Sequence, residues 1–575
     1  MSGKLKMHNM TFEWLRTQIV GIDSLIDTPF GSRPLVYCDY TASGRSLWFV
    51  ENYLLGVQRF YANTHTEDDI TGRSMTRLLH DAETSIKKAV NAGPGGRIIS
   101  VGTGATGAID KYQQILGIAI APATRAARRE HMTEYFGNDA VQAFSEFEQR
   151  RRPVVFVGPY EHHSNEVSWR QGIATVVEVR LAADGEIDLA HLELLLQDPA
   201  YLGRRRIGSF SAASNVTGMR SPVHDIARLL HRHGALSCFD FAASGPYVSI
   251  DMNPPADPDG GDPALDAIFI SPHKFLGGPG SSGLLVFNER VYPRELPPTV
   301  CGGGTVDYVS PEDQDFIADI EARERAGTPG VLQTLKAALA FDIKDALTVE
   351  RIEAKEAQLL KLAFDSWKLN ERIEILGSPD ASRRIGIVSF NIRTPSGRHL
   401  HPKLVTVLLN DLFGIQSRAG CSCAGPYGHR LLGIGSDISG QYREFVRKGF
   451  QGIKPGWCRL GFHFTMDETD AQYVVDAVNF VSTHGYRFLP LYDFDVRTGQ
   501  WRHRGFKESS EPFSLHIALA SSLHEDTAIP EAVRRERYGE YLRGALAVVE
   551  SLPADSVSPA RTMDMDFGAL RYFDL

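Results

Sequence analysis

The stretch that decides the fold reads Ser271-Pro272-His273-Lys274-Phe275-Leu276-Gly277-Gly278-Pro279-Gly280, directly after an apolar run at residues 265–270. The apolar run is typical of a buried β-strand, and the glycines mark a turn after it. Similar short apolar runs lie at residues 97–101, 154–157, 207–211 and 236–241, with amphipathic stretches between them. This alternation is typical of βαβ units, so we predict an α/β fold with a mainly parallel sheet.

Polar residues follow several of these predicted strands. In open parallel sheets, ligands bind beyond the carboxyl ends of the strands. A partly desolvated lysine such as Lys274 can act as a nucleophile toward a carbonyl group, and Ser271 and His273 offer donors suited to a phosphate. Taken alone, a solvated lysine beside a tight turn is an equally good interpretation.

The other strand ends favour a cofactor site. The segment Gly102-Thr103-Gly104-Ala105-Thr106-Gly107 opens a predicted helix at residues 105–118. A helix N-terminus binds anions, and this spacing matches neither the Walker pattern nor the dinucleotide fingerprint. A small cofactor bearing a phosphate remains. An imidazole of the pair His162-His163 could stack on an aromatic ring, and the carboxylate of Asp240 could keep a pyridine nitrogen protonated.

This ordered set of motifs, from about residue 37 to residue 484, resembles the class V aminotransferase family. Within that family it resembles the branch of cysteine desulfurases and selenocysteine lyases. The resemblance implies the PLP-dependent transferase fold of type I: a large α/β domain with a mainly parallel seven-stranded-type sheet, and a smaller α+β domain. It also implies pyridoxal 5′-phosphate (PLP) as the cofactor, and at least a homodimer.

The resemblance implies a role for individual residues. Lys274 would form the Schiff base with PLP, Asp240 would pair with the ring nitrogen, His162 would stack on the ring and Asn215 would contact its hydroxyl. The residues implied in phosphate binding are Ala105, Thr106, Ser271, His273 and, from the partner subunit, Thr305. Those implied in substrate binding are Asn63, His65, Arg418 and Arg459, with Arg459 gripping the substrate carboxylate.

The segment at residues 416–426 bears on the reaction, because it resembles the desulfurase loop. By that register Cys423 is the cysteine that forms a persulfide, and Arg418 is the arginine near the substrate. A thiolate is stabilised near a cation, and it could attack the sulfur of the substrate cysteine, with release of alanine. Two residues depart from the family: Cys421 stands where histidine is common, and Ala243 where glutamine usually contacts the ring hydroxyl.

Three hypotheses follow for the function. The first is a cysteine desulfurase-like enzyme that removes sulfur from L-cysteine through a Cys423 persulfide. The second is another class V enzyme (an aminotransferase, epimerase or carbon–sulfur lyase) that acts on a specialised-metabolite amino acid, which Ala243 favours. The third is a non-catalytic protein that retains PLP, which the intact Lys274, Asp240 and Arg459 disfavour.

The cysteines also allow a structural interpretation, because free cysteine is commonly a buried packing residue. This interpretation competes with function for Cys423, and we prefer it for Cys421, which could otherwise relay or trap sulfur. We expect packing roles for the remaining four cysteines: Cys38, Cys238, Cys301 and Cys458.

The 575 residues suggest several domains. We predict an N-terminal helical segment at 1–30, a large PLP-binding domain at 31–330, a small domain at 331–484 and a C-terminal extension at 485–575. A charged, helix-favouring insertion is expected at about 121–152. The extension should begin with a β-hairpin near residues 488–499.

Composition limits the partners. A net charge of −9 and a pI near 6.1 disfavour nucleic acid and anionic membranes as partners. We find no secretory signal and no apolar run of membrane-spanning length, and six cysteines in so long a chain form no disulfide framework. We therefore expect a cytoplasmic enzyme that takes an amino-acid substrate, with a possible sulfur-acceptor protein as partner and no metal site.

Overall fold

The computed structural model describes residues 10–64, 66, 68–256, 260–507, 528–553 and 570–574. By its contacts the chain divides into two compact units. Residues 43–215 and 219–349 form one, called here the Lys274 unit. The described residues up to Ala42, Val216–Gly218 and the described residues from Glu350 onward form the other, called here the Arg459 unit. The domain boundaries expected from the sequence remain predictions.

A seven-stranded sheet forms the centre of the Lys274 unit. Five neighbouring strands run parallel, and β10 is antiparallel to both of its neighbours, β4 and β9. The strands, in sheet order, are β4 (Gly96–Val101), β10 (Gly283–Asn288), β9 (Ala267–Ile270), β8 (Leu236–Asp240), β7 (Arg206–Ser211), β5 (Val154–Val157) and β6 (Thr175–Glu178). The predicted α/β fold with a mainly parallel sheet is confirmed.

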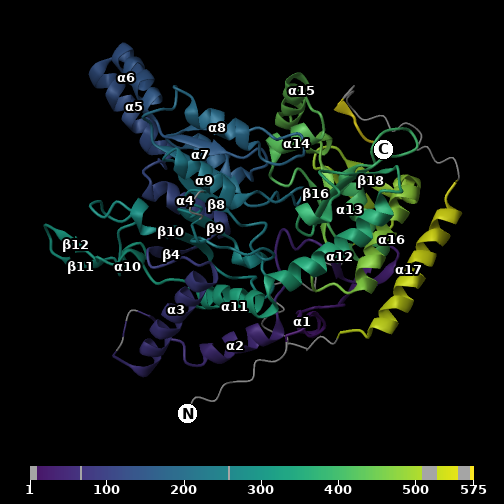
Figure 1. Ribbon diagram of the computed structural model, residues 1–575. Helices are drawn as coiled ribbons and strands as arrows, with labels where there is room; N and C mark the ends of the chain where they lie inside the picture. The colour runs from purple at the N-terminus through teal and green to yellow at the C-terminus, as the bar shows by residue number, and fades with distance from the viewer. Residues whose placement is uncertain are drawn as a thin grey trace. The chain divides into compact units, whose positions relative to one another are not determined.

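The central strands form because their residues suit burial on both faces. All four residues of β5 and all four of β9 are buried. β-Branched and aromatic side chains pack well in such strands, and a parallel sheet covered by helices on both faces needs no polar face. Of the helices in this unit, α11 (Val331–Leu347) packs beside α3 (Ile70–Ala89), as Figure 1 shows.

The unit contains further helices and one small hairpin besides the central sheet. Residues 122–151, where a helix-favouring segment was expected, form the two helices α5 and α6, and Val141 is the one residue of these helices with a buried side chain. The elements are α2 (Trp48–Gln58), α4 (Gly104–Ile115), α5 (Pro122–Phe136), α6 (Asn138–Arg151), α7 (Val167–Gln171), α8 (Leu189–Gln197), α9 (Val223–Arg232), α10 (Ile320–Arg323), β11 (Val306–Val309) and β12 (Gln314–Phe316).

A four-stranded antiparallel sheet forms the centre of the Arg459 unit. Its order is β13 (Ile373–Ile375), β14 (Ile387–Ile392), β17 (Trp457–Gly461) and β16 (Arg418–Gly420). β15 (Ile415–Gln416), which precedes β16 in the chain, pairs in parallel with β3 (Val36–Tyr37). This pairing fixes the segment around residue 36 beside the segment around residue 415. The remaining elements are α1 (Phe12–Gln18), β1 (Leu25–Thr28), β2 (Gly31–Pro34), α12 (Val349–Trp367), α13 (Pro402–Phe413), α14 (Gly425–Leu431), α15 (Ser436–Arg447) and α16 (Glu468–His484).

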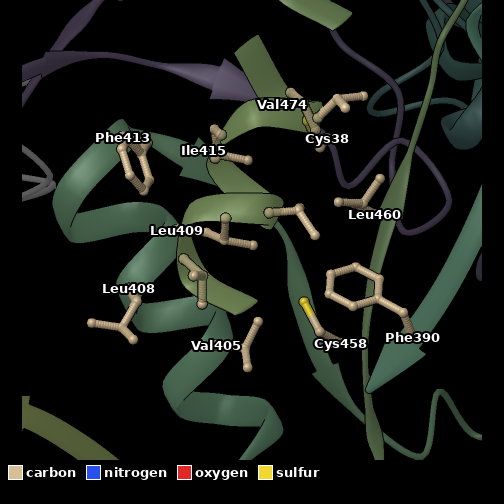
Figure 2. Close-up of a cluster of buried hydrophobic side chains, with 14 of the residues drawn as sticks. Cys38, Phe390, Val405, Leu408, Leu409, Phe413, Ile415, Cys458, Leu460 and Val474 are labelled. Atoms are coloured by element: carbon tan, nitrogen blue, oxygen red, sulfur yellow. The ribbon is translucent and has the colours of Figure 1, made fainter. Parts of the chain in front are cut away.

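The core of the Arg459 unit lies between this sheet and its helices. Figure 2 shows part of it, where Leu408, Leu409 and Phe413 of α13 gather with Phe390 and Cys458 from the sheet. Each of these side chains is at most 1% exposed. Burying a leucine or phenylalanine side chain in such a core contributes about 2–3 kcal/mol to stability.

The late segments belong to the same core. The predicted hairpin is present as β18 (Tyr492–Asp495) and β19 (Gln500–His503), and α17 spans Glu531–Ser551. Tyr492, Trp501 and Tyr538 are all buried in the core of the Arg459 unit. None of the helices in the described ranges has the length and apolar character that crossing a lipid bilayer requires.

His463, just after β17, makes the stability of this unit depend on pH. Its ring stacks on Tyr40 at a centroid distance of 3.7 Å, and its Nδ1 lies 2.7 Å from the Thr465 hydroxyl. The side chain is 1% exposed, and burial lowers its pKa to about 3. Folded His463 therefore stays neutral where the unfolded chain, with a pKa near 6.5, binds a proton.

We expect the free energy of unfolding to fall by about 1.4 kcal/mol for each pH unit below 6.5 because of this one residue. The His463 contribution is complete above pH 6.5 and is lost as the pH falls toward 3. Urea denaturation at pH values from 5 to 7.5 measures this slope. His463→Gln, which does not titrate, should flatten it, whereas His131→Gln on exposed α5 should not. Equal slopes for wild type and His463→Gln would contradict the prediction.

Candidate functional site

One cavity of about 210 Å³ lies in the Lys274 unit. It is lined by all eight residues expected to hold the cofactor within one subunit: Ala105, Thr106, His162, Asn215, Asp240, Ser271, His273 and Lys274. The sequence separates these residues by up to 169 positions, and the fold brings them to one place.

The direction of the strands explains this convergence. Asp240 ends β8, Ser271 follows β9 and His162 comes after β5, and these three strands are parallel. Because β10 is antiparallel to both β4 and β9, β4 runs in the same direction as β9. The loop before α4 therefore opens at the same edge, where ligands bind in sheets of this kind.

The start of α4 forms the part of the cavity best suited to an anion. Gly104 begins the helix with φ of +56°, and a Cβ there would lie 2.8 Å from the Ser271 hydroxyl. The backbone N–H of Ala105 donates to the Ser271 Oγ at 2.8 Å, and the hydroxyls of Thr106 and Ser164 lie 2.7 Å apart. A helix N-terminus with hydroxyl donors beside it is suited to a phosphate.

Lys274 and Asp240 supply the opposite charges of the cavity. Lys274 ends the short 3₁₀ helix Pro272–Lys274, and Asp240 is buried, with 5% exposure. Burial raises the pKa of Asp240. The hydrogen bond from the Ala242 N–H (2.8 Å) and the positive charge of Lys274 lower this pKa, but by less than burial raises it. A buried carboxylate of this kind is suited to a cationic ring nitrogen.

His162 is oriented by its neighbours. Its Nδ1 accepts the N–H of Ser164 at 3.1 Å and lies 3.1 Å from the hydroxyl of the same residue. Beside it, the Glu161 carboxylate accepts the N–H groups of Gly158 (3.1 Å) and Ser211 (2.8 Å) and the amide of Asn165 (2.7 Å). Burial raises the pKa of Glu161 to about 7. Glu161 therefore connects the loop that carries His162 to the end of β7.

His273 enters the cavity as a neutral group. Burial, with a smaller contribution from the charge of Lys274, lowers the pKa of His273 to about 4. Its backbone carbonyl accepts the N–H of Gly44 at 2.9 Å. A Cβ at Gly44 would lie 2.0 Å from the carbonyl oxygen of Phe275. Only glycine therefore allows the backbone at residue 44 to approach residues 273–275 this closely.

The Arg459 unit contains a separate group of charges. Arg418 and Arg459 face each other across β16 and β17, and the carboxylate of Asp39 accepts a hydrogen bond from each. The distances are 2.9 Å from Arg418 Nε and 3.2 Å from Arg459 Nη2. Burial lowers the pKa of Arg459, the charge of Asp39 opposes this shift, and the charge of Arg418 adds to it.

Cys421 and Cys423 lie on a tight turn in the same unit. The N–H of Ala424 donates to the carbonyl of Cys421 at 3.0 Å, and the two residues between them have φ of +51° and +55°. Trp457 Nε1 donates to the hydroxyl of Ser422 at 3.1 Å and holds the turn. Both cysteines are exposed, which contradicts a role as buried packing residues. Cys423 is also close enough to Arg459 for its charge to raise the arginine pKa.

Comparison with known proteins decides the family. The sequence profile of the family described as aminotransferase class-V matches residues 137–474, more than half of the chain. The chain belongs to the aminotransferase class-V family. Members of this family are PLP-dependent enzymes, so the prediction of a PLP-dependent enzyme with this fold is confirmed.

Several relatives in the class-V family carry the name "Probable cysteine desulfurase". The protein of that name from Halalkalibacterium halodurans is 27% identical over 70% of this chain and 87% of its own length. One from Staphylococcus epidermidis is 26% identical over 74% of this chain and 91% of its own length.

Solved structures of cysteine desulfurases share the fold of this class-V chain. The enzyme from Thermococcus onnurineus has a TM-score of 0.60 at 19% identity, over 78% of this chain and 95% of its own. The one from Escherichia coli has a TM-score of 0.59 at 20% identity, over 82% and 98%.

Two residues of the Lys274 unit that the resemblance assigns to this class-V site, Asn63 and Thr305, are not among the residues that line the cavity. Asn63 Nδ2 donates to the Thr328 hydroxyl at 3.3 Å. Thr305 is fully buried in its own subunit, and its hydroxyl donates to the carbonyl of Gly302 at 2.8 Å. Contact with a partner's phosphate would require that bond to be replaced. His65 lies outside the described residues.

Some features of this class-V chain were missed from the sequence. Thr103, Ser164, Ser211, Ala213 and Ala242 also line the cavity. Their position at or just after strand ends was the available signal. Ala243, where the resemblance predicts glutamine, lines the cavity as well. Of the four cysteines expected to pack, Cys38, Cys238 and Cys458 are buried, but the prediction is wrong for Cys301, which is exposed.

Proposed function

We propose that this protein is a PLP-dependent cysteine desulfurase, which removes sulfur from L-cysteine through a persulfide on Cys423 and releases alanine. The observation that carries the proposal is the exposed Cys423, which lies on a tight turn shortly after β16, the strand that carries Arg418. The relatives named as cysteine desulfurases support it, since they match most of their own length.

The donor set of the cavity fits PLP. The phosphate would bind at the start of α4, with the hydroxyls of Thr106 and Ser271 and the neutral imidazole of His273. Gly104 supports this fit, because a Cβ there would fill the space beside the Ser271 hydroxyl. Asp240 would face the ring nitrogen, and Lys274 would hold the cofactor covalently.

Each of the chain's own residues has a task in this mechanism. PLP, when bound, supplies an electron sink for the bonds at the substrate's α and β carbons. Lys274 Nζ, as an amine, would move a proton at the substrate. Asp240, a buried carboxyl group at the end of β8, would keep the ring nitrogen protonated, and His162, held through its Nδ1, would keep the ring in place. Arg459 would bind the substrate carboxylate, for which a guanidinium is suited.

Cys423 performs the sulfur transfer. Its thiolate bonds to the substrate sulfur, the carbon–sulfur bond of the substrate breaks, and the substrate β carbon takes a proton. The products are the Cys423 persulfide and alanine, so atoms and electrons balance without another reactant. A thiol of a sulfur-acceptor protein would then take the outer sulfur atom. A homodimer and a cytoplasmic location remain part of the proposal.

The test compares the two cysteines of the turn. We expect wild type to form alanine from L-cysteine, and Cys423→Ala to form it at least about 100-fold more slowly, because the nucleophile is gone. Cys421→Ala is the matched control: it is also exposed, lies on the same turn, and should retain single-turnover alanine formation. Alanine and sulfide are measured with and without added thiol. Alanine formation that survives in Cys423→Ala would reject the persulfide.

Ala243 favours a second candidate, another class V enzyme acting on a different amino acid. Its methyl group lines the cavity and cannot make the hydrogen bond of the usual glutamine to the ring hydroxyl. The electronic properties of the bound ring, and with them the bond that breaks, would then differ. A PLP absorption band without alanine formation from L-cysteine would favour this candidate, to be followed by a screen of other amino acids.

A further inference from the structure

Asp39 lies between the two arginines assigned to the substrate. Its Oδ2 accepts from Arg418 Nε at 2.9 Å, and its Oδ1 accepts from Arg459 Nη2 at 3.2 Å. The Asp39 side chain is 13% exposed, that of Arg459 is 5% exposed and that of Arg418 is 54% exposed. One carboxylate is therefore shared by one buried and one accessible cation.

The backbone fixes Asp39 in this position. The N–H of Cys38 donates to the carbonyl of Gln416 at 2.9 Å, two residues before Arg418. The carbonyl of Cys38 accepts the N–H of Gly461 at 2.7 Å, two residues after Arg459. Asp39 is thus held between the strand segments that carry the two arginines, and this arrangement is part of the fold.

The charges explain why a carboxylate stands here. Arg418 and Arg459 are directly opposite in the antiparallel ladder, where like charges repel. The charge of Arg418 lowers the pKa of Arg459, and the charge of Asp39 raises it. Arg418, Arg459 and Asp39 together have a net charge of +1. A ligand with a single carboxylate group would neutralise this charge.

We propose that Asp39 determines which anions this site accepts: by cancelling one of two positive charges, it adapts the arginine pair to a substrate with a single carboxylate and disfavours dianions. The proposal rests on the proposed function, in which Arg459 binds the substrate carboxylate. It gives Asp39 a role in specificity beyond holding the arginines in place. Selecting against a wrong ligand by charge is a common source of specificity.

The test measures how strongly butyrate and succinate bind, since they have the same number of carbons and differ by one carboxylate. Asp39→Asn keeps the shape of the side chain and raises the net charge of the group to +2. We expect this variant to bind succinate better relative to butyrate by at least about tenfold compared with wild type. Isothermal titration calorimetry gives the ratio of dissociation constants, and competitive inhibition of alanine formation gives it independently.

Matched variants separate charge from structure. Asp39→Glu keeps the charge and should keep the wild-type ratio. Asp493→Asn removes the same charge from an exposed carboxylate of the same unit, which pairs with Arg504 at 3.0 Å, and should also keep it. The double variant Asp39→Asn with Arg418→Gln returns the group to +1 and should restore the wild-type ratio, even if Asp39→Asn alone folds poorly.

An unchanged ratio in Asp39→Asn, or equal weakening of both ligands, would overturn the proposal, because either result describes a purely structural residue. So would the absence of binding of either ligand to both wild type and Asp39→Asn. Failure of wild type to form alanine from L-cysteine is a different result. It would reject the proposed reaction, while the calorimetric ratio would still test the role of Asp39.

Discussion

Replacing Lys274 with alanine is expected to abolish the visible absorption band of the bound cofactor and to slow turnover by about 1,000-fold or more. The amine would be lost both as the group that holds the cofactor and as the group that moves a proton, and each role is worth orders of magnitude. Absorption spectra of the purified protein and single-turnover alanine formation measure the two effects.

Two variants make this result specific. Lys274→Arg keeps a positive charge, which acts on the pKa of Asp240 in the wild type, but a guanidinium does not bond to the carbonyl. It should therefore lose the band as Lys274→Ala does, while remaining folded. Lys88→Ala, at the exposed end of α3, should keep both the band and the activity. A band unchanged in Lys274→Ala would show that the cofactor is held elsewhere.

The cavity of the Lys274 unit could be predicted from the sequence because its signals are local. Each predicted strand is a short apolar run, and a polar residue or a glycine follows it within a few positions. A parallel sheet brings all such strand ends to one edge. Most residues that line the cavity therefore lie at or just after the end of a predicted strand. β6 and β10 were not among the predicted strands, and the antiparallel direction of β10 could not have been predicted either, because the direction of a buried strand leaves no mark in its apolar residues.

The arrangement of the Arg459 unit could not be predicted in this way. Asp39 is 379 residues from Arg418 and 420 residues from Arg459 in the sequence. The residues around Asp39 contain no pattern that predicts either arginine as its partner. The turn at Cys421 and Cys423 has two consecutive non-glycine residues with positive φ, a conformation that propensities disfavour and that the contact with Trp457 helps to hold. Where tertiary contacts override local conformational preference, local sequence patterns do not predict the backbone conformation or the contacts.

The same limit applies to α17, whose docking depends on a buried ionic cluster in the Arg459 unit. Arg534 of α17 is 3% exposed and bonds to Asp470 and Asp467 of the α16 region, with Asp23 at 3.8 Å. Arg16 pairs with the same Asp23 at 2.7 Å and with Asp470 at 3.1 Å. The two arginines and three aspartates therefore hold together segments from both ends of the chain.

Arg534→Met is expected to destabilise the docking of α17 by about 3–5 kcal/mol. Methionine fills similar space but leaves buried carboxylates with too few cations, and removing one partner of a buried ionic group costs this much. Hydrogen–deuterium exchange should show the protection of α17 amides falling by about two to four orders of magnitude.

The neighbouring Arg535 provides the control, because its side chain is 71% exposed and pairs with Glu531 at 2.6 Å on the same helix. Arg535→Met should leave the protection of α17 nearly unchanged, because exposed ion pairs contribute little to stability. Adding Asp470→Asn to Arg534→Met removes one of the excess charges and should recover part of the lost protection. Equal exchange in Arg534→Met and Arg535→Met would mean that apolar contacts such as that of Tyr538 with Tyr473, stacked at 3.9 Å, hold α17 without the ionic cluster.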